Sequence, residues 1–190
     1  MSNLFFRAGL FVLVGYFVSV FPSAADQATL TCATNLAAQY GNYTYGTGSN
    51  RIDCVHFVLK VAECRLGGKL SPDVRKAVLI AHGWSDGVTD QIAAVGTNAQ
   101  LAGIQYALTS VTNLGTVIQP TAAKAGDFVQ YWRQSGNHWQ GHSAVITAVR
   151  NGRFATILGA HASMNRVAEL DKPLDLLGTN RLVYVVRIGD

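Results

Sequence analysis

Apolar residues in the first part of the chain recur at helical spacing. Leu30, Leu36 and Tyr40 indicate a helix over residues 26–40. The next stretch, 41–52, is rich in Gly, Asn, Thr and Ser and is expected to be a loop. Apolar residues then recur at i, i+3, i+4 and i+7 from Val55 until Gly67-Gly68, which predicts a second helix that ends at the glycines.

Two further helices are expected before the pattern changes. Ser71-Pro72-Asp73 combines a capping hydroxyl, a proline in the first turn and an acid near the helix N-terminus, and it predicts a helix to about Ala81. Residues 82–96 are expected to form a long loop or a broken helix, and residues 97–110 a fourth helix.

The second half of the chain has the short β-branched and aromatic runs that are typical of strands. The expected strands are 127–133, 143–150, 153–158 and 182–188. Asn151-Gly152 is a strong signal for a two-residue hairpin between two of them. Helices followed by antiparallel strands predict an α+β fold in which the N-terminal helices pack on a central antiparallel β-sheet.

The first residues are typical of an export signal. A basic Arg7 precedes an apolar run over 8–21, and Ser23-Ala24-Ala25 offers the small residues that signal peptidase requires. We expect a signal peptide over 1–25, a single catalytic domain over 26–190 and a periplasmic or secreted protein. The alternative is an uncleaved anchor, but the run is shorter than the roughly 20 residues of a spanning helix. No stable membrane insertion is expected after cleavage.

Charge adds little to this picture. Removal of residues 1–25 takes away one of the 15 basic residues and none of the 11 acidic ones. The remaining mild positive charge suits attraction to an acidic polymer such as the cell wall. Long Lys/Arg runs and nucleic-acid-binding motifs are lacking, so we expect no nucleic acid partner.

Three cysteines are an odd number for an oxidising compartment, in which thiols tend to pair. Cys32 and Cys64 fall on the first two expected helices, and the sequence leaves open whether they form a disulfide. If they do, Cys54 is the free thiol. Cys54 opens the second helix, where unpaired N–H groups and the helix dipole stabilise a thiolate and an oxyanion. The alternative for Cys54 is a buried small apolar residue or a disulfide partner.

A histidine with a suitable position strengthens the catalytic interpretation of Cys54. His142 is expected at the start of a strand, and a base on a strand facing a cysteine on a helix N-terminus is the arrangement that forms a thiolate–imidazolium pair. His161, at the end of the strand after the hairpin, is the candidate that orients His142. His138 is the rival for the base, in the loop before His142.

The ordered set of short motifs resembles the NlpC/P60 family. The matching segments are Asn42-Tyr43-Thr44-Tyr45-Gly46, Asp53-Cys54-Val55-His56-Phe57-Val58, Gly126-Asp127-Phe128-Val129, Gly141-His142-Ser143-Ala144-Val145-Ile146, Gly152-Arg153-Phe154 and His161-Ala162-Ser163. The resemblance extends from about Tyr40 to Ile188. It implies a papain-like α+β fold and hydrolysis of peptide or amide bonds in cell-wall peptides.

By its motif positions, the resemblance implies Cys54 as nucleophile, His142 as base and His161 as the residue that orients the base. Tyr45 corresponds to the tyrosine beside the nucleophile, and Asp53 to the acid that helps hold the substrate's amine.

The chain departs from the family in two places. Val55-His56 stand where the family usually has Ser-Gly, so the pocket beside the nucleophile differs and specificity for a D-glutamyl to diamino-acid bond is open. The stretch between Cys54 and Gly126 is also longer than in compact members, and it adds the helices that begin near Ser71 and Thr97.

The remaining histidines and tryptophans have less specific interpretations. His56 points away from Cys54 on the helix and is expected to be packed or on the surface, and His82 is expected in a solvated loop. The three tryptophans are expected either to line a substrate groove or to belong to the core. They are Trp84, Trp132 and Trp139. The Cys and His spacings match no standard zinc pattern, so no metal and no cofactor are expected.

Three functions remain open. The first is a cysteine peptidase or amidase that hydrolyses peptidoglycan stem peptides through an acyl-enzyme, acting as a monomer. The second is an acyltransferase with the same thiolate, and the third a non-catalytic cell-wall-binding module. The sequence names neither the bond that is cut nor the biological role, which is wall remodelling or attack on another cell's wall.

Overall fold

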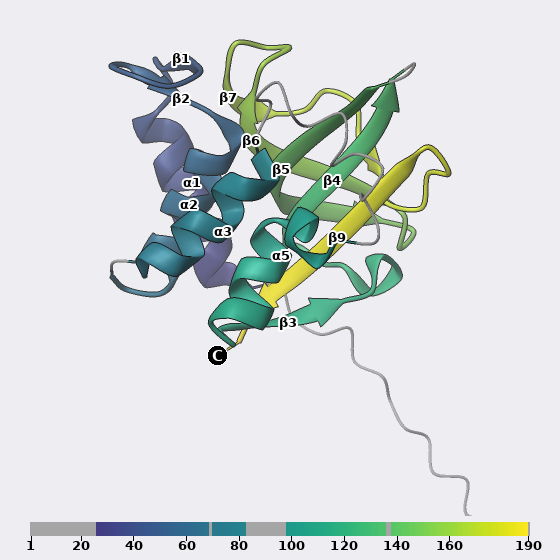
Figure 1. The fold of residues 1–190 in the computed structure, drawn as a ribbon. Helices are drawn as coiled ribbons and strands as arrows, with labels where there is room; N and C mark the ends of the chain where they lie inside the picture. Colours follow the sequence, from purple (N-terminus) through teal and green to yellow (C-terminus); the bar gives the residue numbers. More distant parts are fainter. Residues whose placement is uncertain (1–25, 69, 83–97, 136–137, 190) are drawn as a thin grey trace, which may run out of the picture.

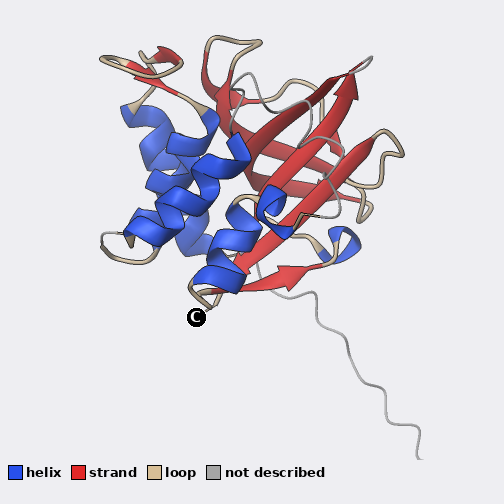
Figure 2. Ribbon diagram, in the orientation of Figure 1, coloured by secondary structure: helices blue, strands red, loops and turns tan. Residues whose placement is uncertain are grey.

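The helices and strands of the chain form two layers (Figures 1 and 2). The computed structural model describes residues 26–68, 70–82, 98–135 and 138–189. The helical elements are α1 (Gln27–Gln39), α2 (Cys54–Arg65), α3 (Pro72–His82), η1 (Ala99–Ala102), α5 (Ile104–Tyr106), η2 (Ala107–Val111) and η3 (Pro120–Ala122). The strands are β1 (Thr44–Tyr45), β2 (Arg51–Ile52), β3 (Gly115–Ile118), β4 (Phe128–Ser135), β5 (His138–Arg150), β6 (Phe154–His161), β7 (Arg166–Glu169), β8 (Leu174–Asp175) and β9 (Arg181–Ile188). The expected α+β class is confirmed.

The main sheet has seven strands in the order β3-β9-β4-β5-β6-β7, with β8 paired to β6, and every neighbouring pair is antiparallel. The hairpin expected at Asn151-Gly152 joins β5 and β6. Both residues have positive φ, 54° and 61°, and the N–H of Arg153 donates to the carbonyl of Arg150 at 3.1 Å. This is the geometry that makes Asn-Gly a favoured hairpin sequence.

Strand β5 begins earlier than the sequence predicts. Its ladder with β4 continues to the pair Ser135↔His138, so His142 lies inside β5 and not at a strand start. The prediction that His138 lies in a loop is wrong for the same reason. Long-range pairing extends a strand beyond what local propensity indicates.

The expected helix over 97–110 is broken. Gly103 has φ 56° and ψ −119°, a conformation that favours glycine, and it separates η1 from the helical turns α5 and η2. The short strands β3, β7 and β8 were not expected, and the pair β1 and β2 lies within the expected loop over 41–52. The expected signal peptide and residues 83–96 lie outside the described residues.

The sheet separates two apolar clusters. Phe57, Val58 and Val61 of α2 pack with Phe128 and Val145 on the face that carries the helices. The opposite face has its own cluster, whose members include Val129, Ile146, Ile157 and Val185. Alternate residues of β4 and β5 therefore enter different layers.

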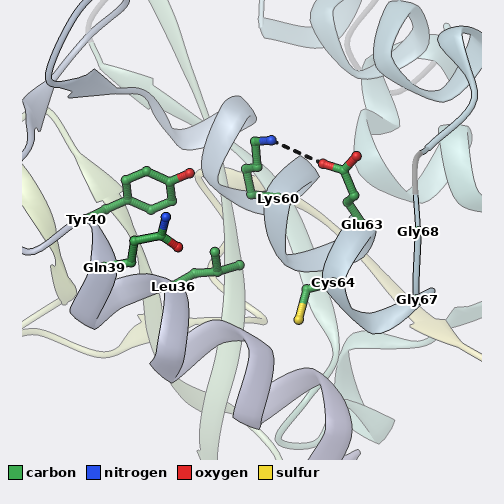
Figure 3. Close-up of a pocket in the computed structure, with 8 residues that line it drawn as sticks. All are labelled: Leu36, Gln39, Tyr40, Lys60, Glu63, Cys64, Gly67 and Gly68. Atoms are coloured by element: carbon green, nitrogen blue, oxygen red, sulfur yellow. Dashed lines mark hydrogen bonds and ion pairs between the residues drawn. The ribbon is translucent and has the colours of Figure 1, made fainter.

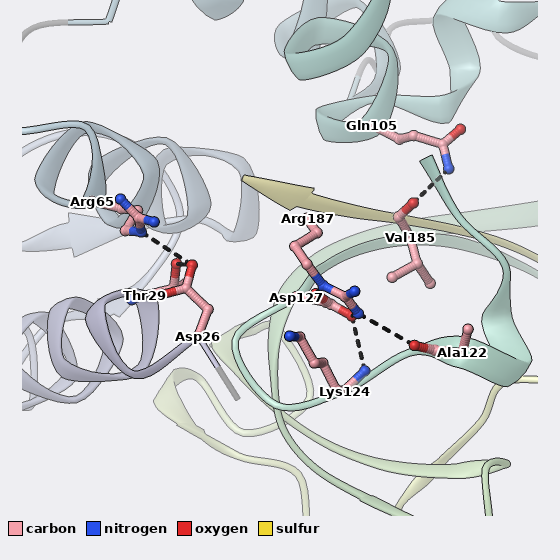
Figure 4. Close-up of polar contacts among 9 residues, drawn as sticks. All are labelled: Asp26, Thr29, Arg65, Gln105, Ala122, Lys124, Asp127, Val185 and Arg187. Carbon is pink, nitrogen blue, oxygen red and sulfur yellow. Dashed lines mark hydrogen bonds and ion pairs between the residues drawn. The ribbon is translucent and has the colours of Figure 1, made fainter. Parts of the chain in front are cut away.

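Polar contacts connect Asp26 and Asp127 to distant parts of the fold (Figure 4). Asp26 caps α1 by accepting from the N–H of Thr29 at 3.1 Å, and it also pairs with Nε of Arg65 at 3.0 Å. Asp127 is fully buried and accepts from Nε and Nη2 of Arg187 at 2.7 and 2.9 Å. A two-pronged pair of this kind fixes the start of β4 against the end of β9.

A disulfide joins Cys32 of α1 to Cys64 of α2, and Cys54 is a free, buried thiol. The pairing that the sequence left open is therefore present. Of the helices in the described ranges, none has the length and apolar character to cross a membrane.

Candidate functional site

The start of α2 has the form that the sequence predicts. The carboxylate of Asp53 caps the helix, because its Oδ1 accepts from the N–H of His56 at 2.8 Å. Cys54 is the first helical residue, and its side chain is 1% exposed. Among the described residues, the one cysteine outside a disulfide is thus held at a helix N-terminus.

The thiol contacts a tyrosine from the preceding loop. The hydroxyl of Tyr45 lies 3.8 Å from Sγ of Cys54, within hydrogen-bonding distance for sulfur. The loop is held in turn by a hydrogen bond from the N–H of Tyr45 to Oδ1 of Asn165, at 3.1 Å, in the turn after β6. The expectation that Tyr45 lies beside Cys54 is confirmed.

The hydrogen-bonded ladder between β5 and β6 ends next to this thiol. Their described ladder runs from Arg150↔Phe154 to Val145↔Leu158 and does not reach Ser143. Because backbone N–H groups alternate in direction along a strand, the N–H of Ser143 points, like that of Val145, toward the side where β6 departs. This N–H hydrogen-bonds to the thiol of Cys54. The nucleophile candidate is therefore seated against the β5 backbone immediately after His142.

Burial controls the protonation of the thiol. It raises the pKa of Cys54 to about 11, and the nearby carboxylate of Asp53 adds to the rise. The N–H of Ser143, the Tyr45 hydroxyl and the N–H of Val55 act in the opposite direction without overcoming it. The expectation that the helix start lowers the pKa of this thiol is wrong, because desolvation of the anion outweighs the helix N–H groups. The thiol needs a base to ionise at neutral pH.

His142 and His161 lie ring against ring. Their centroids are 4.6 Å apart and their planes are inclined by 30°. Nε2 of His142 is buried and lies on the side of Gly159, where an added Cβ would come within 3.5 Å of it. The structure therefore brings together the two histidines that the sequence singled out, from β5 and from the end of β6.

His161 is a neutral imidazole. Burial lowers its pKa to about 4, although a hydrogen bond to the carbonyl of Ala168 opposes the shift. Nε2 of His161 lies 3.0 Å from that carbonyl oxygen, and only a protonated Nε2 can donate to it. The tautomer is thereby fixed, with the proton on Nε2 and a lone pair on Nδ1.

Tyr131 packs against His142 and lies within electrostatic range of the thiol. Its ring meets the ring of His142 edge to face, with centroids 5.5 Å apart. Burial raises the pKa of Tyr131 to about 12, and the negative charge of an ionised Cys54 contributes to the rise. Local sequence contains no signal for Tyr131, because its nearness to His142 follows from the β4–β5 register alone.

Two more residues beside the thiol follow from that register. Gln130 and Ser143 are direct cross-strand partners on the helix-covered face, 2% and 1% exposed. The hydroxyl of Ser143 donates to Oε1 of Gln130 at 2.5 Å. A buried polar pair is costly unless its hydrogen bonds are made, and this pair holds the residue whose N–H contacts Cys54.

Asp53 has little surface for a substrate. Its side chain is 3% exposed, and Oδ1 accepts a second hydrogen bond from Nδ1 of His56 at 2.9 Å. His56 itself is half-exposed, in agreement with the expectation that it is packed or on the surface. The imidazole of His56 thus separates the Asp53 carboxylate from the solvent.

Trp132 and one surface depression are separate features of the structure. Trp132 is buried and donates from Nε1 to the carbonyl of Leu101 at 2.8 Å, which is a core role. An open surface depression lies between α1 and α2 beside the disulfide (Figure 3). Its lining residues are Leu36, Gln39, Tyr40, Lys60, Glu63, Cys64, Gly67 and Gly68. It does not include Cys54.

In the part of the chain that the structure describes, no group of three or more His, Cys, Asp or Glu residues is placed to hold a metal ion. The groups described at the site are a thiol, two imidazoles and two phenols. No family model, no curated protein and no solved structure matches the chain.

Proposed function

We propose that the chain is an exported cysteine hydrolase of peptide bonds in peptidoglycan stem peptides, with the papain-like architecture of the NlpC/P60 family. The observation that carries the proposal is the seat of Cys54: a free thiol at a helix start, hydrogen-bonded to the strand residue that follows His142. Export agrees with the disulfide between Cys32 and Cys64, since such bonds persist in oxidising compartments.

The proposed mechanism begins with proton transfer. His142 takes the proton of the Cys54 thiol, and the resulting thiolate attacks the carbonyl carbon of the substrate. The tetrahedral oxyanion is stabilised by N–H groups at the start of α2. His142 then donates its proton to the leaving amine, and an acyl-thioester remains on Cys54. Water, deprotonated by His142, hydrolyses the thioester and releases the free thiol.

In this mechanism His161 positions His142 and carries no charge. A neutral partner with a fixed tautomer holds the ring of His142 without competing for its proton. Tyr45 contacts the sulfur during attack, and Asp53 maintains the helix start. We propose that His56, which covers Asp53, changes the substrate pocket that the family builds there.

The test is digestion of purified muropeptides by residues 26–190, followed by mass spectrometry. We expect cleavage by the unmodified protein, none by Cys54→Ala, and unchanged cleavage by Lys76→Ala, a control on the exposed surface of α3. Undiminished cleavage by Cys54→Ala would refute the proposal. A new amide or ester adduct in place of hydrolysis would instead identify an acyltransferase, and wall binding without any product a binding module.

A further inference from the structure

Two arginines face each other on the sheet near the site. Arg133 of β4 and Arg181 of β9 are direct cross-strand partners. Both follow the alternation that places Tyr131 and Val183 on the face opposite the helices. Directly opposed like charges destabilise a sheet unless a counter-charge lies between them.

The described hydrogen bonds of these two guanidinium groups go to neutral acceptors, although the carboxylate of Asp175 also attracts Arg181. Arg133 donates from Nη2 to Oε1 of Gln140 at 2.9 Å, and Arg181 from Nη1 to the backbone carbonyl of Asp175 at 3.3 Å. The carboxylate of Asp175 is held by Arg153 at 2.9 and 2.8 Å. The acid that attracts Arg181 thus already forms a two-pronged ion pair with Arg153.

Arg181 has an unused donor. Its Nε is buried and has no hydrogen-bond partner among the described residues. A buried charged donor without an acceptor is costly, and such groups are rare in folded proteins. An anion bound between the two guanidinium groups would satisfy this donor and relieve the repulsion.

The arginine pair is connected to the catalytic residues through Tyr131. Arg133 and Arg181 both lower the pKa of Tyr131, and the negative charge of an ionised Cys54 raises it, so this phenol is within electrostatic range of both. Its ring also touches His142, with centroids 5.5 Å apart. A ligand on the arginines is therefore separated from His142 by one side chain, that of Tyr131.

We propose that Arg133 and Arg181 form a subsite for a free carboxylate of the peptide substrate, next to the bond that Cys54 attacks. The proposal rests on the function proposed above, and it adds a requirement for a substrate with an anionic group near the scissile bond. The planar guanidinium fork matches the two oxygens of a carboxylate. The charge of Arg153 is already paired with the carboxylate of Asp175. Arg133 and Arg181 are therefore not part of the continuous basic surface that a nucleic acid backbone needs.

The experiment measures binding to the Cys54→Ala variant by calorimetry, so that it does not depend on turnover. The two probes are a synthetic stem pentapeptide with all its carboxylates free and the same peptide with those groups converted to carboxamides. We expect the free-acid peptide to bind at least about 10-fold more tightly, as charge-assisted hydrogen bonds predict.

Substitutions then locate the subsite. In the Cys54→Ala background, Arg133→Gln and Arg181→Met should each weaken binding of the free acid by about 10-fold or more and leave the carboxamide unchanged. Arg181→Lys keeps the charge but loses the fork, so it should recover only part of the affinity. Arg150→Gln removes the same charge from an exposed position of β5 and is the matched control, with no expected change.

Thermal melts establish that each variant is folded, and Arg133→Gln, which alters an exposed side chain, remains informative if Arg181→Met unfolds. Equal binding of the two peptides, or equal weakening by Arg150→Gln, would overturn the subsite even if wild-type protein cleaves both peptides. Carboxylate-selective binding without cleavage by the wild type would support the subsite and overturn the proposed hydrolysis.

Discussion

The sulfur of Cys54 is shielded from water. Its hydrogen bonds come from the N–H of Ser143, the hydroxyl of Tyr45 and the N–H of Val55. Desolvation outweighs them, and the pKa of the thiol rises to about 11. At this scale the site favours the neutral thiol until a neighbouring group takes its proton.

The role of His142 is testable through thiol chemistry. In His142→Ala the thiol titrates alone, so its alkylation by iodoacetamide should rise about tenfold per pH unit between pH 7 and 10, below a pKa of about 11. In the wild type, transfer of the proton to His142 should bring the rate to a plateau at lower pH. Mass spectrometry of samples quenched at successive times measures the alkylation rates of both proteins. Superimposable profiles for the two proteins would exclude His142 as the base.

His161 makes stability depend on pH in a definite direction. Burial lowers its pKa from the ordinary 6.5 to about 4, so between these values the unfolded chain binds a proton that the folded protein does not. The stability that this neutral imidazole contributes is complete above pH 6.5 and is lost as the pH falls toward 4, by up to about 3 kcal/mol.

Urea denaturation at pH 7 and pH 4.5 measures this loss, with His161→Phe as the comparison. The variant has no imidazole at this position, so its stability should fall by less over the same interval. The loss from titrating carboxylates is common to both proteins and cancels. An equal decrease in both would show that His161 does not titrate as the structure indicates.

Among the elements, α2 was the most predictable. Its apolar spacing, its cap at Asp53 and its stop at Gly67 are all local features, and the structure confirms each of them. Strand β5 was less predictable because its extension to His138 depends on pairing with β4. The broken segment around Gly103 shows the same limit, since the spacing of apolar residues did not reveal the break.

The cap of α2 is expected to contribute to the free energy of unfolding. Asp53→Ala removes the acceptor for the N–H of His56 and should lower the free energy of unfolding by about 0.5–2 kcal/mol. Asp53→Asn keeps an acceptor oxygen and should lose less. Asp73→Ala, which removes an exposed acid from the first turn of α3, is the control, with a smaller effect. Urea titration distinguishes the three, and equal losses for Ala and Asn would contradict a capping role.

Across the whole molecule, the ion pair between the buried Asp127 and the partly exposed Arg187 joins the start of β4 to the end of β9 (Figure 4). Breaking it leaves an uncompensated charge in the protein, whereas exposed ion pairs contribute little. The pair is about 60 residues apart in sequence, so its contribution belongs to the assembled fold.

Asp127→Ala should therefore lower the free energy of unfolding by about 3–5 kcal/mol. Lys60→Gln, which breaks the exposed pair with Glu63, is the matched control and should cost less than about 1 kcal/mol. Chemical denaturation measures both. A loss near that of the control for Asp127→Ala would show that the pair does not stabilise the sheet.

The sequence by itself determined the α+β class, the starts of α1 and α2, the hairpin at Asn151-Gly152 and the candidate residues Cys54, His142 and His161. These follow from local spacing, turn chemistry and ordered motifs. Only the tertiary structure decided that Cys32 pairs with Cys64, that burial raises the pKa of Cys54, and that β5 and β6 part beside it. It also decided which side chains stand opposite one another on β4, β5 and β9, because strand register and desolvation depend on contacts between segments far apart in the chain.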